Sequence, residues 1–186
     1  RLAQYLEIRW WRQYLASRPK ESYLQSKQAY WSRVLKELHF EPEAGQRALE
    51  VGCGPAGLFV LLHEYQQFTA IDPLLDQYTD QLPHFKKADY PTVNFLAQPL
   101  EEVKPPREKY PIIYCFNAIN HVADWQACLE QISTMAAPAA QLLISSDVHH
   151  RKWLRNLFRF LPGDALHPQQ HLAEEYVNAL EQLGWE

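Results

Sequence analysis

The stretch Glu50-Val51-Gly52-Cys53-Gly54-Pro55-Ala56-Gly57 decides the fold, because it ends an apolar strand with a glycine-rich turn and opens a helix. The strand is expected at Ala48–Val51 and the helix at Gly57–Tyr65. Asp72 follows Gly52 by 20 residues, at the end of the next apolar run. The glycines let the backbone approach a ligand closely, and an acid at a strand end can accept the hydrogens of both ribose hydroxyls. The pattern predicts a site for an adenosine cofactor without choosing which one.

Short apolar runs alternate with helical patterns around this stretch, which is typical of βαβ units in a parallel sheet. Further strands are expected at 68–71, 93–97, 111–116 and 141–145, and further helices at 73–82, 124–135 and 172–183. The run 111–116 is apolar almost throughout, as in a strand that is buried on both faces. Gly184 is the expected C-terminal cap of the last helix. The prediction is a doubly wound, Rossmann-like α/β domain at 43–186.

Two helical patterns rich in aromatic residues precede this domain, at about 2–16 and 22–38. Pro19 separates them, because the residue before a proline disfavours helical geometry. Residues 1–42 are therefore expected to form a helical cap or lid. The segment 147–170 is longer than an ordinary connection and contains the basic aromatic stretch 151–160. It is expected to be a lid or substrate-binding insertion, with a helix that covers the sheet edge as the alternative.

Four motifs in the same order resemble the class I S-adenosylmethionine-dependent methyltransferases, over about residues 47–146. They are Glu50-Val51-Gly52-Cys53-Gly54, Ala70-Ile71-Asp72-Pro73, Ala97-Gln98-Pro99-Leu100-Glu101 and Phe116-Asn117-Ala118-Ile119-Asn120-His121-Val122. Glu50 discriminates between cofactors, because a carboxylate there would repel the pyrophosphate of NAD but tolerates the zwitterionic methionine of S-adenosylmethionine. The resemblance implies S-adenosylmethionine as cofactor and S-adenosylhomocysteine as its product.

The resemblance also implies which residues contact this cofactor, all of them at or near strand ends. They are Glu50, Gly52, Cys53, Gly54, Gly57, Asp72, Pro73, Gln98, Pro99, Leu100, Phe116, Asn117 and Ile119. Each of these positions has an ordinary structural alternative. Glu50 and Asp72 are also placed to cap helices, Gln98 to serve as a loop polar group, and Phe116 and Ile119 to fill the core.

The family sheet has the strand order 3-2-1-4-5-7-6, and no sequence follows Glu186 for strands six and seven. The order 3-2-1-4-5 is therefore expected here, with strand five as an apolar edge. A further C-terminal portion, the N-terminal helices or a partner copy in a homodimer could cover that edge. Because the sequence begins at Arg1 and not at a methionine, we expect it to be part of a longer polypeptide.

Transfer from an activated sulfonium mainly requires an acceptor held in line and shielded from water. His121 is the candidate base, with holding of its loop as the alternative role. The fourth motif lacks the Pro-Pro-aromatic sequence of enzymes that methylate adenine or amide nitrogen, so the predicted acceptor is a small, partly apolar molecule. The competing interpretations are a methyltransferase-like binding module without catalysis and an NAD-dependent oxidoreductase.

Composition excludes several other classes of function. The net charge of −4 offers no overall positive field for nucleic acid, and no apolar run approaches the roughly 18 residues that span a bilayer. The three cysteines form no C-x-x-C pair, which favours buried thiols in a reduced, cytoplasmic protein. His167 and His171 have a spacing that can chelate a metal in a helix, but loop and cap roles are preferred and no metal is predicted.

Overall fold

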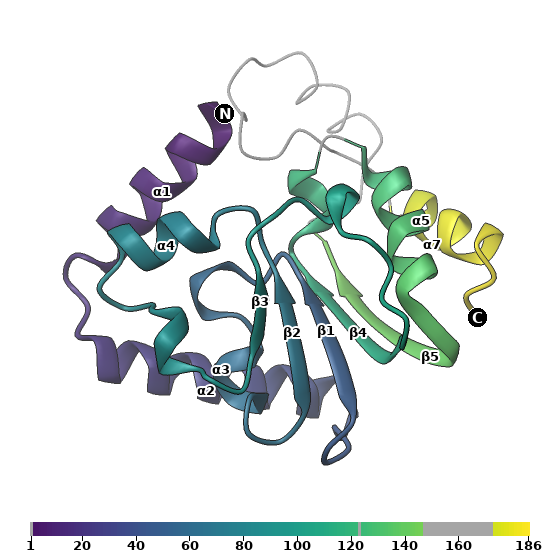
Figure 1. The fold of residues 1–186 in the computed structure, drawn as a ribbon, viewed down its shortest axis with the longest axis horizontal. Coiled ribbons are helices and arrows are strands. Elements are labelled where there is room, and N and C mark those ends of the chain that lie inside the picture. The colour runs from purple at the N-terminus through teal and green to yellow at the C-terminus, as the bar shows by residue number, and fades with distance from the viewer. Residues whose placement is uncertain (1, 123, 147–172) are drawn as a thin grey trace.

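The computed structural model describes residues 2–122, 124–146 and 173–186 and contains a parallel sheet between two layers of helices (Figure 1). The strands are β1 (Arg47–Val51), β2 (Gln67–Ile71), β3 (Asn94–Leu96), β4 (Tyr110–Phe116) and β5 (Ala136–Ser145). Their order is β3-β2-β1-β4-β5, and every pairing is parallel. The predicted fold class and strand order are confirmed.

The helices also follow the sequence pattern closely. They are α1 (Leu2–Leu15), α2 (Lys20–Glu37), α3 (Phe59–Leu62), α4 (Leu75–Gln81), α5 (Trp125–Met135) and α7 (Ala173–Gln182), with 3₁₀ helices at Gly54–Ala56, Lys87–Asp89, Leu100–Glu102 and Ile119–His121. The break between α1 and α2 falls at Pro19, as predicted. Gly184 ends α7 as predicted, since the backbone N–H of Trp185 reaches back to the carbonyl oxygen of Leu180 at 3.0 Å.

Two elements differ from the expectation. The helix expected at 57–65 is shortened to α3, and a 3₁₀ helix at Gly54–Ala56 precedes it, with the extended backbone of Gly57 between the two. β5 begins at Ala136, directly after α5, and not at Gln141. Ala136 pairs with Tyr110, and a register shift between Tyr110 and Ile112 lets β5 start early.

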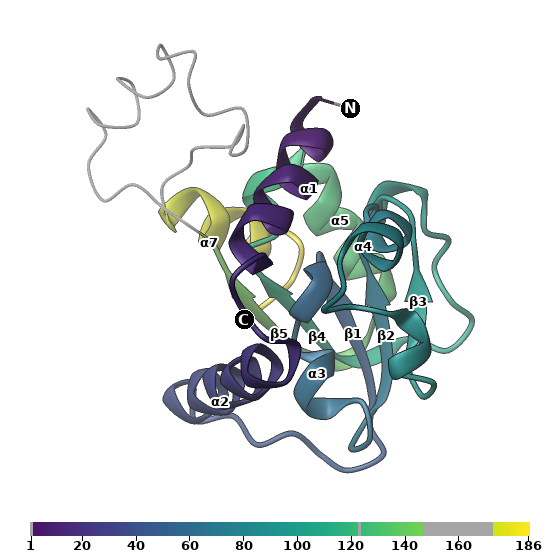
Figure 2. The same ribbon diagram turned by 90° about the vertical axis from the view of Figure 1, so that its left-hand side faces the viewer.

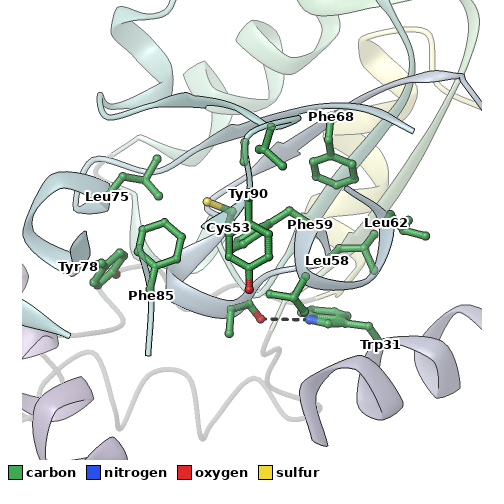
Figure 3. Close-up of a cluster of buried hydrophobic side chains, with 14 of the residues drawn as sticks. Trp31, Cys53, Leu58, Phe59, Leu62, Phe68, Leu75, Tyr78, Phe85 and Tyr90 are labelled. Carbon is green, nitrogen blue, oxygen red and sulfur yellow. Dashed lines mark hydrogen bonds between the residues drawn. The ribbon is translucent and has the colours of Figure 1, made fainter. Parts of the chain in front are cut away.

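Each face of the sheet packs against its own set of helices (Figure 2). Side chains of α1 to α4 share one apolar cluster with Ala48, Phe68 and Tyr114. Side chains of α5 and α7 share the other cluster with Leu49 and Ile113, which point to the opposite face. The first cluster is aromatic, with Phe59, Phe85 and Tyr90 among its members (Figure 3).

The interior strand β4 is covered on both sides, and Ile112, Ile113, Tyr114 and Cys115 have no exposed surface, as the sequence predicted. β5 lies at the end of the sheet, and within the described residues it pairs only with β4. Among the described residues we find no helix with both the length and the hydropathy that a bilayer span requires.

Candidate functional site

The glycine-rich turn after β1 is fastened to the end of β2. The backbone N–H groups of Gly52 and Cys53 both donate to the carbonyl oxygen of Ile71, at 2.8 and 3.1 Å. In the parallel sheet the carboxyl ends of β1, β2 and β4 lie at one edge, so the residues that follow them surround one site. Ligands of open α/β sheets bind at such an edge.

Glu50 is buried beneath this turn and shapes it from inside. Its Oε1 accepts a hydrogen bond from the backbone N–H of Leu58 at 2.6 Å, and its Oε2 accepts one from Phe59 at 3.1 Å. These N–H groups belong to the start of α3, where a carboxylate is favoured. Burial nevertheless raises the pKa of Glu50 to about 8, against the lowering effect of both hydrogen bonds. The capping role expected as an alternative is thus present, and a ligand contact by Glu50 stays a prediction.

The glycines of the turn differ in how much space a side chain would have at each position. Gly52 has a φ of +66° and lies against Ala118, whose Cβ would overlap any side chain at Gly52. Gly57 faces Glu50 Oε1 and the carbonyl oxygen of Cys53, which leave no room for a Cβ. Gly54 is open by comparison, because a Cβ there would first meet the ring of Trp11 at 4.0 Å. Gly54 is therefore the place in the turn where the backbone can approach a ligand.

Asp72 follows β2 and holds the turn from the other side. Its Oδ2 accepts a hydrogen bond from the backbone N–H of Gly54 at 3.0 Å, and its Oδ1 accepts one from Leu74 at 2.8 Å. Burial raises the pKa of Asp72 to about 7, and the charge of Glu7 adds to that effect. Each carboxylate oxygen can accept more than one hydrogen bond, so acceptor capacity remains for a ligand. Pro73, beside Asp72, is exposed.

The remaining predicted contacts lie after β3 and β4, close to the same edge. Gln98 and Pro99 are half-buried, while Leu100 is buried in the second apolar cluster. Phe116, which ends β4, is half-buried, and Ile119 is buried.

Asn117 and His121 follow β4 and are both exposed. Asn117 has a positive φ of 50°, and its backbone N–H donates to the carbonyl oxygen of Ser145 at 2.9 Å. This bond joins the ends of β4 and β5. His121 closes the 3₁₀ helix Ile119–His121, four residues beyond Asn117.

Burial alters the chemistry of Cys53, which lies within the turn. It is 5% exposed, and burial raises the pKa of its thiol well above the ordinary value. The thiol is therefore kept protonated, as expected for a structural cysteine.

Helices α1 and α2 add residues to this site that the sequence analysis did not single out. Trp11 on α1 lies at Gly54, and the Nε1 of Trp31 on α2 donates to the carbonyl oxygen of Ala56 at 3.1 Å (Figure 3). The ring of Trp31 also lies 5.3 Å from that of Phe116. Helical spacing indicated an inward face for both helices, but not the element that this face would meet.

Some predicted features fall outside the described residues. These are the insertion 147–170, its basic aromatic stretch 151–160, and the histidines His167 and His171. Within the part of the chain that the structure describes, no three His, Cys, Asp or Glu side chains gather as metal ligands would.

Comparison with known families gives a match over most of the chain. The family described as methyltransferase domain matches residues 23–186. The chain belongs to the methyltransferase domain family. The family that the four motifs indicated is thereby confirmed. No curated protein matches the sequence.

Solved structures of other proteins share the fold. YcgJ from Bacillus subtilis is 16% identical, with a TM-score of 0.63 over 82% of this chain and 66% of its own. The putative methyltransferase BH2331 from Bacillus halodurans is 13% identical, with a TM-score of 0.67 over 86% and 68%. Phosphoethanolamine N-methyltransferase 2 from Haemonchus contortus, in complex with S-adenosyl-L-methionine, is 15% identical, with a TM-score of 0.63 over 84% and 36%. The chain thus spans about two thirds of the length of the first two proteins and about a third of the length of the last.

Proposed function

We propose that this chain binds S-adenosylmethionine and transfers its methyl group by in-line displacement to a small-molecule acceptor. The observation that carries the proposal is the meeting of Asp72, the glycine turn and the aromatic rings of two helices at one sheet edge. Asp72 and Gly54 are joined by a hydrogen bond, and Trp11 lies at Gly54. Membership of the methyltransferase domain family supports the same conclusion.

The residues present suit this cofactor. Gly54 leaves space for close approach of a ligand, and Asp72 retains acceptor capacity for ribose hydroxyls at the end of β2. Asp72 carries a negative charge when it is ionised, and none of the ion pairs of the described residues balances that charge, which favours a cation over a pyrophosphate. Bound S-adenosylmethionine would supply a methyl group already activated on a sulfonium. The protein then has to position the acceptor and exclude water.

The aromatic side chains of α1 and α2 support a small acceptor. Trp11, Trp31 and Phe116 come from three separate elements and border the same edge of the sheet. Apolar and aromatic walls with few polar groups are typical of small-molecule sites. The net charge of −4 does not favour nucleic acid. His121 is proposed as the base that accepts a proton from the acceptor, since it is exposed near the end of β4.

Calorimetric titration with S-adenosylmethionine, S-adenosylhomocysteine and NAD tests the cofactor. We expect micromolar binding of the first two and none of NAD. Asp72→Ala should lose most of the affinity, because hydrogen bonds to a charged group contribute about 1.5–3 kcal/mol each. Asp80→Ala is the matched control, since Asp80 is an exposed acid on α4. A heat of binding observed with NAD, and with neither S-adenosylmethionine nor S-adenosylhomocysteine, would contradict the proposal.

Methyl transfer is tested with a panel of amine, hydroxyl and carbon acceptors, with S-adenosylhomocysteine release as the readout. Turnover that falls at least about tenfold in His121→Gln, with unchanged cofactor binding, supports the proposed base. Cofactor binding without turnover on any acceptor would instead favour a binding module without catalysis.

A further inference from the structure

The inner face of α1 places a carboxylate beside the glycine turn. Glu7 and Trp11 are four residues apart, and so lie on the same side of the helix. The hydroxyl of Tyr78 donates a hydrogen bond to Glu7 Oε1 at 2.6 Å. The Trp11 ring stands edge-on to the Tyr78 ring, with 6.5 Å between centroids, and also borders Gly54. Glu7 is therefore fixed close to the turn, and not held only by its own helix.

Tyr78 makes this position rigid. Its side chain is fully buried on α4, six residues after Asp72. An exposed carboxylate would be screened by water and salt, and would contribute little to binding at a distance. Glu7 is half-buried and bonded to a buried hydroxyl, so its charge acts through protein more than through solvent.

Glu7 and Asp72 influence each other electrostatically. After burial, which has the larger effect, the charge of Glu7 raises the pKa of Asp72 and also that of Tyr78. Within the described residues, the ion pairs involve neither Glu7 nor Asp72 nor Glu50. The charge of Glu7 and of ionised Asp72 thus has no cationic partner among these ion pairs, and a cationic ligand would neutralise it.

We propose that Glu7 is a specificity-determining residue, whose carboxylate, fixed by Tyr78, favours a cationic sulfonium at the turn over the neutral thioether left after methyl transfer. This inference rests on the proposed function and adds a role for α1 in it. When the acceptor's electron pair forms a bond to the methyl carbon, the pair of the broken carbon–sulfur bond stays on sulfur, which becomes neutral. The attraction to Glu7 therefore exists for S-adenosylmethionine and not for the sulfur of S-adenosylhomocysteine. The product is then released more readily than the substrate.

The test compares the affinities of wild type and Glu7→Gln for both ligands by calorimetry. Glutamine keeps an oxygen that can accept from Tyr78 but carries no charge. We expect the affinity for S-adenosylmethionine to fall on the order of tenfold and that for S-adenosylhomocysteine to change about twofold or less. Glu41→Gln is the matched control, because Glu41 is exposed in the loop that enters β1 from the opposite end of the sheet. It should leave both affinities unchanged.

Tyr78→Phe supplies an independent variant, since it keeps the ring and removes the hydroxyl that orients Glu7. We expect it to lower the ratio of the two affinities as well, and the double variant Glu7→Gln/Tyr78→Phe to lower it no further than Glu7→Gln alone. If wild type binds both ligands and either single variant weakens them equally, the role of Glu7 is overturned while the proposed function stands. If wild type binds neither ligand, both proposals fall.

Discussion

The indole of Trp31 donates a hydrogen bond to the carbonyl oxygen of Ala56 and thereby ties α2 to the glycine-rich turn. Both residues are buried, and the Trp31 ring also contacts Phe116 at the end of β4. One side chain of an N-terminal helix thus contacts both the turn after β1 and the last residue of β4. α2 is therefore part of the framework of the site, as well as a cover for the sheet.

Replacement of Trp31 by phenylalanine tests this connection. We expect Trp31→Phe to lower the free energy of unfolding by about 1–3 kcal/mol, because the buried carbonyl of Ala56 loses its donor. Urea denaturation followed by circular dichroism measures the change. Trp10→Phe is the matched control, since Trp10 is 47% exposed on α1, and it should cost about 0.5 kcal/mol or less. Equal costs for the two variants would show that the bond to Ala56 does not stabilise the fold.

The close contact between Gly52 and Ala118 leads to a second prediction. Gly52→Ala introduces both an unfavourable positive φ and an overlap with the Ala118 side chain. Gly45 has a similar φ of +71° but open space around it, so Gly45→Ala measures the backbone strain alone, about 1–2 kcal/mol. We expect Gly52→Ala to cost roughly 1–3 kcal/mol more than that.

A double variant separates the two effects at Gly52. In the background of Ala118→Gly, the overlap is removed, and Gly52→Ala should then cost no more than Gly45→Ala does. The free energies come from urea denaturation of five proteins, namely wild type, the three single variants and the double variant. A cost at Gly52 that is the same in both backgrounds would mean that the contact with Ala118 is not limiting.

The positions of the strands could be predicted from local patterns, and their order from the resemblance to the methyltransferase family. The apolar runs at 68–71 and 111–116 mark strands, and the glycine turn after β1 marks where the chain leaves the sheet. The acids Glu50 and Asp72 were found for the same reason, since each lies at a strand end. The extended backbone at Gly57, which separates the 3₁₀ helix from α3, was missed, because helical periodicity does not show it.

The contributions of α1 and α2 were not predictable in this detail. Helical spacing shows that Trp11 and Trp31 belong to amphipathic helices, but any apolar face of the domain could have received them. Glu7 resembles a solvated surface charge in the sequence. Only the three-dimensional structure brings it to Tyr78, 71 residues away along the chain.

The buried Glu50 predicts a dependence of stability on pH. Its pKa in the folded protein is about 8, against about 4.5 ordinarily, so between these values the native state binds more protons than the unfolded chain. Stability then falls as pH rises, and is greatest below the unfolded pKa. Asp72, with a pKa of about 7 raised by burial, acts in the same direction between about pH 4 and 7.

We therefore expect the midpoint of urea denaturation to decrease steadily from about pH 5 to about pH 8. Glu50→Gln should show a shallower decrease, because the titrating group is gone, although it loses one of the two hydrogen bonds to α3. Glu41→Gln, at an exposed site, should keep the wild-type slope. A midpoint that rises over this range would contradict the raised pKa of Glu50.

Binding of a cationic cofactor should depend on pH in the opposite sense. A cation beside Asp72 stabilises the ionised carboxylate, whose pKa of about 7 leaves it partly protonated near neutrality. S-adenosylmethionine should therefore bind more tightly as pH rises from about 6 to about 7.5, with release of protons.

Calorimetry in buffers of different ionisation enthalpy counts those protons. Asp72→Asn should reduce both the pH dependence and the number of protons released, while Asp80→Asn, at an exposed position on α4, should change neither. Binding that is equally tight across this range and releases no protons would show that Asp72 is already fully ionised before the cofactor arrives.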